Sequence, residues 1–374
     1  MTGVNTIDTG DAGLLAAYLS AANRGLITQK NANLLLSQQS LAGFELSSDL
    51  AVKSSAFQEE LRQQANQYLQ IVLPAVITTF SNGSNFSALV AAAQRALPNS
   101  NSALLAQADQ IVHTLSALTT QARLYATHAA GLYAQAGVMN QELSYSNKQY
   151  DLVIAQIEQS VSADIKQQTE AIETLNQKIA QNIQGIVDGG TKAGEGVNKI
   201  GQTILASIDV TDKKQDQDKE KDKKNEDENK SKIDTQYLIA GLNGISQGAS
   251  ESSQSVRELR TNNEKLGVLY TQLAKNNSLL SVVKSIQAQN NLFVGAFSRT
   301  YQALSGLEEN WQKVEKQFSS SAEIVATATS EQQVQVIRES LEVGVAQWNL
   351  LSDQMDSIKA IYAGIPMVHG ITHP

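Results

Sequence analysis

The sequence has no cysteine and only four prolines among its 374 residues. Without cysteine, disulfides, thiolate metal sites and cysteine nucleophiles are all excluded. No proline occurs from residue 99 to residue 365, which leaves this long stretch without the strongest helix breaker. Aromatic residues amount to 5% of the chain, fewer than closely spaced strands and turns would need. The composition therefore predicts an all-α fold.

A basic surface and long apolar runs are also absent. The formal net charge is −8, and Lys and Arg alternate with acidic residues, which argues against binding to nucleic acid. No run approaches the ~18 uninterrupted apolar residues of a resident transmembrane helix. The first residues, MTGVNTIDTGDAG, contain neither a basic n-region nor an apolar h-region. We therefore expect a protein that is soluble when synthesised and carries no Sec-type signal.

Motifs that would carry chemistry are missing as well. On one helix His113 and His128 would lie roughly 22 Å apart, too far to share a metal ion, while His369 and His373 sit in a tail with Gly and Pro. The run GGTK at residues 189–192 resembles a phosphate loop, but it follows a helical pattern rather than a strand. We expect no catalytic residues, no cofactor and no metal site, and hence no enzyme.

Apolar residues recur at helical spacing over most of the chain. The helices expected in the first half cover residues 13–29, 47–79 with a bend or an end at Pro74, 87–97 after a turn at 81–85, and 102–186. At 1.5 Å per residue the last of these would be a rod on the order of 125 Å. The pattern resumes over residues 256–318 and 330–362. Trp311 and Trp348 lie on its apolar stripes, so we expect them in the core rather than in a ligand cage.

Two of these segments carry the spacing of a coiled-coil seam. The outgoing seam consists of Ile154, Ile157, Val161, Ile165, Ile172, Leu175, Ile179 and Ile183. The return seam consists of Leu259, Leu266, Leu273 and Leu280, which recur every seven residues. Asn263 and Asn277 fall at the alternate position of the return seam, with Tyr270 between them, and buried Asn at such a position fixes register. We expect the two segments to pair with each other.

The most unusual stretch lies between the two seams, at residues 183–249. Two apolar, glycine-rich arms, residues 183–210 and 233–249, flank a charged tip at 211–232 that contains no hydrophobic residue. This pattern predicts a hairpin with a solvated tip, held away from both termini. The residues that we expect to insert into a membrane are Ile186, Val187, Val197, Ile200, Ile204, Leu205, Ile208, Val210, Tyr237, Leu238, Ile239, Leu242 and Ile245.

Apolar surface on this hairpin must be covered by its own bundle, bind a partner or enter lipid. Each arm is too interrupted to cross a membrane alone, but an amphipathic arm can cross if neighbouring copies cover its polar side in a ring. A tongue of about ten residues per strand can also span a membrane if it is closed into a barrel. The competing interpretation is a hairpin that caps a dimeric coiled coil, in which the glycines allow close helix contact. A non-membrane scaffold, such as a phage or secretion-system protein whose hairpin docks a protein partner, fits that second interpretation.

These patterns together predict an elongated bundle of about five helices. Two very long antiparallel helices project from it and carry the apolar hairpin at their far end. The expected division of the chain is residues 1–182 for the bundle and outgoing helix, 183–249 for the hairpin head, and 250–374 for the return helix and closing helix.

This layout resembles the cytolysin A superfamily of α-helical pore-forming toxins, which includes haemolysin BL and the xenorhabdolysin-type toxins. The resemblance is one of organisation: a cysteine-free helical bundle, a very long helix, a central apolar hairpin, a long return helix and a closing helix around Trp348. It implies a secreted, soluble monomer whose head rearranges at a target-cell membrane. It also implies partners: membrane lipid, further copies of the chain in a ring and often a second toxin component.

The hairpin departs from that pattern in two respects. Its charged tip of 22 residues is longer and more polar than a compact membrane-inserting tongue needs, and its arms are richer in glycine than a deeply embedded helix would be. These departures favour a component that binds or escorts a more hydrophobic partner.

Overall fold

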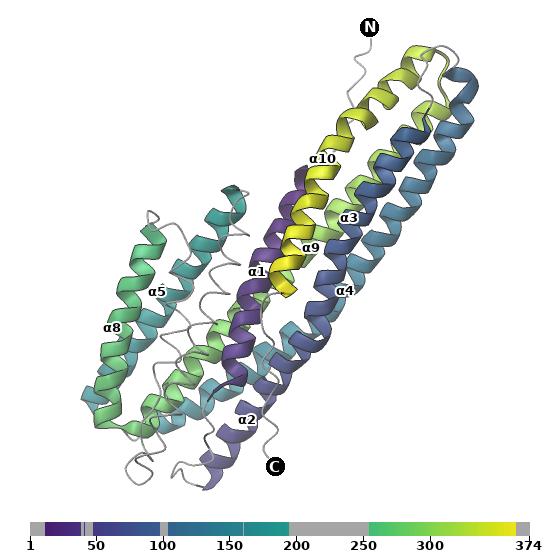
Figure 1. Ribbon diagram of the computed structural model, residues 1–374. Coiled ribbons are helices and arrows are strands. Elements are labelled where there is room, and N and C mark those ends of the chain that lie inside the picture. Colours follow the sequence, from purple (N-terminus) through teal and green to yellow (C-terminus); the bar gives the residue numbers. More distant parts are fainter. Residues whose placement is uncertain are drawn as a thin grey trace. The chain divides into compact units, whose positions relative to one another are not determined.

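The computed structural model describes residues 12–38, 41, 48–97, 104–159, 161–193 and 254–363 (Figure 1). These residues form helices and short connections, which confirms the all-α prediction for this part of the chain. In chain order the α-helices are α1 (Ala12–Leu36), α2 (Ser48–Gln67), α3 (Leu73–Ala96), α4 (Ala108–Glu158), α5 (Ala163–Ala193), α8 (Gln254–Asn276), α9 (Ser278–Ala326) and α10 (Glu331–Ala363). A π-helical turn, Tyr68–Val72, separates α2 from α3 next to Pro74, where we expected the helix to bend or end.

The chain forms two compact units. The first is built from segments within Met1–Ala21, Pro74–Ala136 and Tyr301–Ala360. Its core is a cluster of aromatic rings. Trp311 and Trp348 are buried with their ring centroids 6.3 Å apart, and the ring of Phe86 lies 4.8 Å from that of Trp348. The expectation that both tryptophans are core residues is therefore confirmed.

The turn expected at residues 81–85 is wrong, because α3 continues through SNGSN. At Gly83 an added Cβ would lie 2.9 Å from Leu351 Cδ2 and 3.2 Å from the Tyr18 ring, so the missing side chain lets α10 approach α3 closely. The Ser84 hydroxyl donates a hydrogen bond to Asp356 Oδ1 at 3.1 Å. Packing against α10 thus outweighs the turn preference of these residues.

The second unit is built from segments within Ala22–Leu73, Gly137–Thr300 and Ile361–Pro374. In it the Tyr68 ring packs edge-on against Phe297, with centroids 5.7 Å apart, and the Tyr68 hydroxyl donates to the Gly25 carbonyl at 3.0 Å. The expected end of the first helix before Lys30 is wrong, because α1 runs to Leu36. Lys30 and its neighbour Asn31 are buried, so tertiary burial carries the helix through a stretch that reads as polar.

The single rod expected over residues 102–186 is also wrong. Helix α4 ends at Glu158 and α5 begins at Ala163. The return segment breaks as well, since α8 ends at Asn276 and α9 begins at Ser278. Two very long helices do exist, because α4 has 51 residues and α9 has 49.

Most seam residues are nonetheless buried as expected. They include Ile154, Ile157, Ile172, Ile179, Ile183, Leu259, Asn263, Leu266, Tyr270, Leu273 and Leu280. Asn277 is a correction: its Oδ1 accepts the Leu280 N–H at 2.9 Å, so it caps the start of α9 instead of occupying the seam. Helices α5 and α8 pair with each other, in agreement with the prediction.

Gly83 provides a test of the close approach in the first unit. Gly83→Leu should destabilise the protein by about 1–3 kcal/mol, because the new side chain overpacks the contact with Leu351 and Tyr18. The matched control is Gly131→Leu on α4, where an added Cβ meets nothing within 4 Å. Urea unfolding curves compare the two variants, and equal stabilities would contradict the account.

The buried Lys30 predicts a pH dependence. Burial lowers the pKa of its ammonium from 10.5 to about 7. Because the unfolded chain keeps the higher pKa, folding stability falls as the pH drops from about 10.5 to about 7 and stays reduced below that. Lys30→Met should therefore be more stable than the wild type, by a margin that grows as the pH falls through this window, by at most about 1.4 kcal/mol per pH unit.

Urea unfolding at a series of pH values measures that margin. Lys53→Met is the control, since Lys53 is exposed on α2 in the same unit. Parallel pH profiles for Lys30→Met and the wild type would show that burial does not perturb the Lys30 ammonium.

Candidate functional site

The candidate site is the paired α5 and α8, the helices that lead into and out of the hairpin head. Among the residues expected to insert into a membrane, Ile186 and Val187 lie near the end of α5 and are both buried. The others lie outside the described residues: Val197, Ile200, Ile204, Leu205, Ile208, Val210, Tyr237, Leu238, Ile239, Leu242 and Ile245. The hairpin at the tip and the three-part division of the chain therefore remain predictions.

Helices α5 and α8 lie side by side and antiparallel (Figure 1). The Asn276 amide at the end of α8 donates to Gln168 Oε1 near the start of α5, at 3.2 Å. The side chains of Ile172 and Ile179 from α5, and of Leu266 and Leu273 from α8, are buried. The two helices thus form one amphipathic pair with an apolar interior.

This pair does not continue outward from α4 and α9. Glu173 on α5 forms an ion pair with Lys284 on α9, and Asp188 near the end of α5 lies 3.3 Å from the Arg24 guanidinium on α1. After Glu158 the chain therefore reverses, and α5 runs back along helices of the same unit. The prediction of a straight rod that holds the head away from the bundle is wrong for the described residues.

Lys284 lies at the centre of this reversal. Its side chain is 1% exposed, and its ammonium lies 2.9 Å from Glu158 Oε1 at the end of α4. It also pairs with Glu173, which is half-exposed on α5. The Tyr270 hydroxyl from α8 donates to the Lys284 carbonyl at 3.1 Å. Residues of α4, α5 and α8 therefore converge on one buried lysine of α9.

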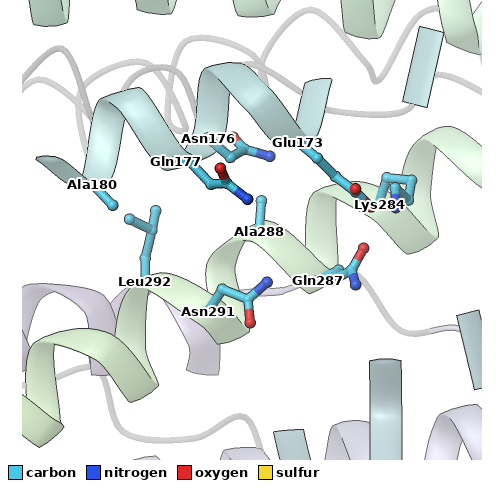
Figure 2. Close-up of a pocket in the computed structure, with 9 residues that line it drawn as sticks. All are labelled: Glu173, Asn176, Gln177, Ala180, Lys284, Gln287, Ala288, Asn291 and Leu292. Atoms are coloured by element: carbon cyan, nitrogen blue, oxygen red, sulfur yellow. Dashed lines mark hydrogen bonds and ion pairs between the residues drawn. The ribbon is translucent and has the colours of Figure 1, made fainter. Parts of the chain in front are cut away.

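The contact between α5 and α9 is polar and incompletely packed. A pocket of about 340 Å³ lies between them, with Glu173, Asn176 and Gln177 on one wall and Lys284, Gln287 and Asn291 on the other (Figure 2). Such an interface lacks the dense apolar packing that makes a core hard to open.

The carboxyl group of Asp151, next to this pocket, is partly buried. The Gln287 amide donates to Asp151 Oδ1 at 2.6 Å. Burial raises the pKa of the Asp151 carboxyl above its ordinary value, against the lowering effects of this hydrogen bond and of the Lys284 charge. The surroundings of Lys284 thus contain three acidic side chains, Asp151, Glu158 and Glu173.

Sequence reasoning missed Lys284, although a signal was present. Lys284 is the only charged residue between Ser278 and Ser298, a mainly apolar and amide-rich stretch. A single lysine in such a stretch must be buried with a partner or disrupt the helix packing. The partners themselves were not predictable, because both Glu158 and Glu173 read as ordinary surface acids of a continuous helix.

Two further properties of the described residues bear on function. None of the helices in these ranges combines the length and the apolarity that crossing a membrane requires. No group of three or more His, Cys, Asp or Glu side chains within the same ranges is arranged to hold a metal ion.

Among known proteins, this chain is similar to proteins of known structure. No protein-family model matches the sequence, and no curated protein matches it. Solved structures do match. Soluble SmhA, from the tripartite α-pore-forming toxin Smh of Serratia marcescens, is 30% identical, with a TM-score of 0.76 over 100% of both chains.

Less similar structures share the fold. The HblL1 toxin component of Bacillus cereus is 13% identical, with a TM-score of 0.70 over 96% of this chain and 98% of that one. Soluble AhlB, from the tripartite toxin AHL of Aeromonas hydrophila, is 15% identical, with a TM-score of 0.65 over 95% of both chains. The AhlB pore matches with a TM-score of 0.59 at 18% identity, over 95% of this chain and 98% of that one. Because the identity to SmhA reaches 30% over the whole of both chains, this chain belongs to the family of tripartite α-pore-forming toxin components.

Proposed function

We propose that this protein is a secreted toxin component that is soluble until its head, residues 183–249, enters a target-cell membrane. Copies of the chain then assemble there, together with a second toxin component. The observation that carries the proposal is the full-length similarity to soluble SmhA, a component of a tripartite α-pore-forming toxin. The arrangement of α5, α8 and α9 supports a way in which the soluble form could release the head.

The seam pattern is compatible with a second, straighter arrangement of the same helices. In the return segment Leu273 belongs to α8 and Leu280 to α9, yet the seven-residue spacing runs across the break between them. In the outgoing segment Ile157 lies in the last turn of α4 and Ile172 lies on α5, again on one continuing pattern. The apolar spacing therefore also fits helices that are longer than those of the folded-back form. A chain with two such packings is suited to a switch.

The folded-back arrangement is held by contacts that can be exchanged for water. The Glu173–Lys284 and Arg24–Asp188 ion pairs each involve a carboxylate that is about half-exposed, so water screens part of their attraction. The buried Lys284 ammonium keeps Glu158 as a partner when Glu173 moves away. The pocket beside Lys284 is lined by polar and apolar side chains in nearly equal share. By contrast, the seam between α5 and α8 is apolar, so the two helices would separate from α9 as a pair.

The charged tip limits how the head can enter a bilayer. Residues 211–232 carry sixteen charged side chains, and moving them through hydrocarbon without compensation is prohibitive. Insertion therefore needs neighbouring copies or a second component that line a water-filled path for the tip. This requirement supports assembly with partners over insertion by a single chain.

A deletion tests the role of the head. Removal of residues 196–245 should abolish binding to liposomes and release of an enclosed dye, and should abolish red-cell lysis, because the apolar arms are lost. The control removes only residues 212–231, and it should keep lipid binding because both arms remain. Liposome flotation, dye release and haemoglobin release measure the outcome. Unchanged lysis after the larger deletion would overturn the assigned role of the arms.

A labelling experiment tests the release of α5 from α9. Ala288→Cys places a single thiol in this cysteine-free chain, at a buried position of α9 that lines the pocket. In this background Glu173→Gln should raise the rate of maleimide labelling about fivefold, since losing one partner of Lys284 costs about 1 kcal/mol.

The control for this experiment is Glu170→Gln, an exposed acid on the same helix that makes no ion pair among the described residues. It should leave the labelling rate unchanged. Equal rates for Glu173→Gln and Glu170→Gln would show that the ion pair does not hold α5 in place.

A further inference from the structure

Helix α4 carries a line of exposed apolar side chains that the proposed function does not use. Val138, Tyr145 and Leu152 are 59%, 63% and 56% exposed. They are spaced by seven residues, so they lie on one edge of the helix. All three belong to the second compact unit.

The rotation of α4 about its axis is fixed by contacts on its other side. Leu143, Ser146 and Tyr150 are fully buried. The Ser146 hydroxyl donates to Glu60 Oε1 at 2.7 Å and accepts from the Gln64 amide at 3.4 Å, both on α2. The line of Val138, Tyr145 and Leu152 therefore lies on the exposed edge of a helix whose opposite side is packed.

A seven-residue repeat of apolar side chains on a fixed helix face is typical of a surface that pairs with another helix. Two exposed charged residues flank this line, Glu142 three positions before Tyr145 and Lys148 three positions after it. Neither side chain forms an ion pair within the described ranges. Apolar residues thus stand at equal distances on either side of Tyr145. The charged residues also stand at equal distances from it, but Glu142 is negative and Lys148 is positive.

We infer that this face of α4 binds the same face of a second copy of the chain, with the two helices antiparallel and Tyr145 at the two-fold axis. In such a pair, residues equally far from position 145 lie at the same height. Val138 then contacts Leu152 of the other copy, and Glu142 comes within reach of Lys148 of the other copy. Because the pair is two-fold symmetric, each of these contacts occurs twice. A parallel pair would instead place Glu142 beside Glu142 and Lys148 beside Lys148.

The symmetric pattern favours a second copy over an unrelated protein, because an unrelated partner would not require matching about Tyr145. A contact made by one helix face is smaller than a standard protein interface, so the dimer dissociates on dilution. The contact is isologous and closes on itself. It is a property of the soluble protein in the absence of membrane, and it stands or falls independently of the proposed pore-forming function.

Cysteine cross-linking tests the geometry, because the wild-type chain contains no cysteine. Under mild oxidation Tyr145→Cys should give a covalent dimer, since both thiols lie at the axis. Val138→Cys alone should not, because its counterpart in an antiparallel pair lies about 21 Å away along the helix. The combination Val138→Cys/Leu152→Cys should form the dimer again. Cross-linking of Val138→Cys as readily as Tyr145→Cys would overturn the antiparallel pairing.

Sedimentation over a range of concentrations tests the charges without altering the apolar line. Glu142→Lys should abolish dimerisation, because lysines then face each other at both ends of the contact. The double variant Glu142→Lys/Lys148→Glu should restore it. Glu170→Lys, at an exposed position on α5, changes the net charge by the same amount; it is the control for a general effect of net charge and should leave dimerisation unchanged. A wild-type protein that stays monomeric at all concentrations, or a double variant that fails to recover, would overturn the inference.

Discussion

The buried ammonium-bearing residue Lys284 is the point at which residues of α4, α5 and α8 converge on α9. It draws Glu158 from the end of α4 and Glu173 from α5 toward the same point on α9. A charge with 1% exposure is tolerable only with such partners, so the reversal of the chain and the burial of the lysine depend on each other. The result is a helix pair, α5 and α8, that keeps an apolar seam inside while it contacts its neighbours through polar groups.

The two compact units differ in the chemistry of their interiors, and this difference has functional meaning. The first unit has a dense aromatic cluster around Trp311 and Trp348. The second unit buries Lys30, Asn263 and Lys284 and contains the pocket between α5 and α9. Interiors of the first kind are dense and resist opening, whereas polar contacts can be exchanged for water at low net cost. The proposed rearrangement of the head would exchange these polar contacts for water.

Much of the fold could be predicted from the sequence because its signals are repetitive. The absence of cysteine, the rarity of proline and the spacing of residues such as Ile172, Leu259 and Leu266 are enough for an all-α chain with a paired seam. The breaks at residues 159–162 and at Asn277 could not be predicted, because the apolar spacing runs through both. The predictions at Gly83 and Lys30 were wrong because both depend on tertiary packing: Gly83 lies against Leu351 and Tyr18, and Lys30 is buried. The main feature of the site, Lys284 with Glu158 and Glu173, likewise depends on contacts between residues that are distant in the sequence.

On the proposed function, α5 lies against α9 in the soluble protein and leaves it when the head meets a membrane. Spin labels at Gln177→Cys on α5 and Asn291→Cys on α9, which line opposite walls of the pocket, report the separation of the two helices directly. Pulsed electron paramagnetic resonance should give one short distance in solution and a much longer one after lysis of added vesicles. An unchanged short distance in vesicles that have been lysed would contradict the account.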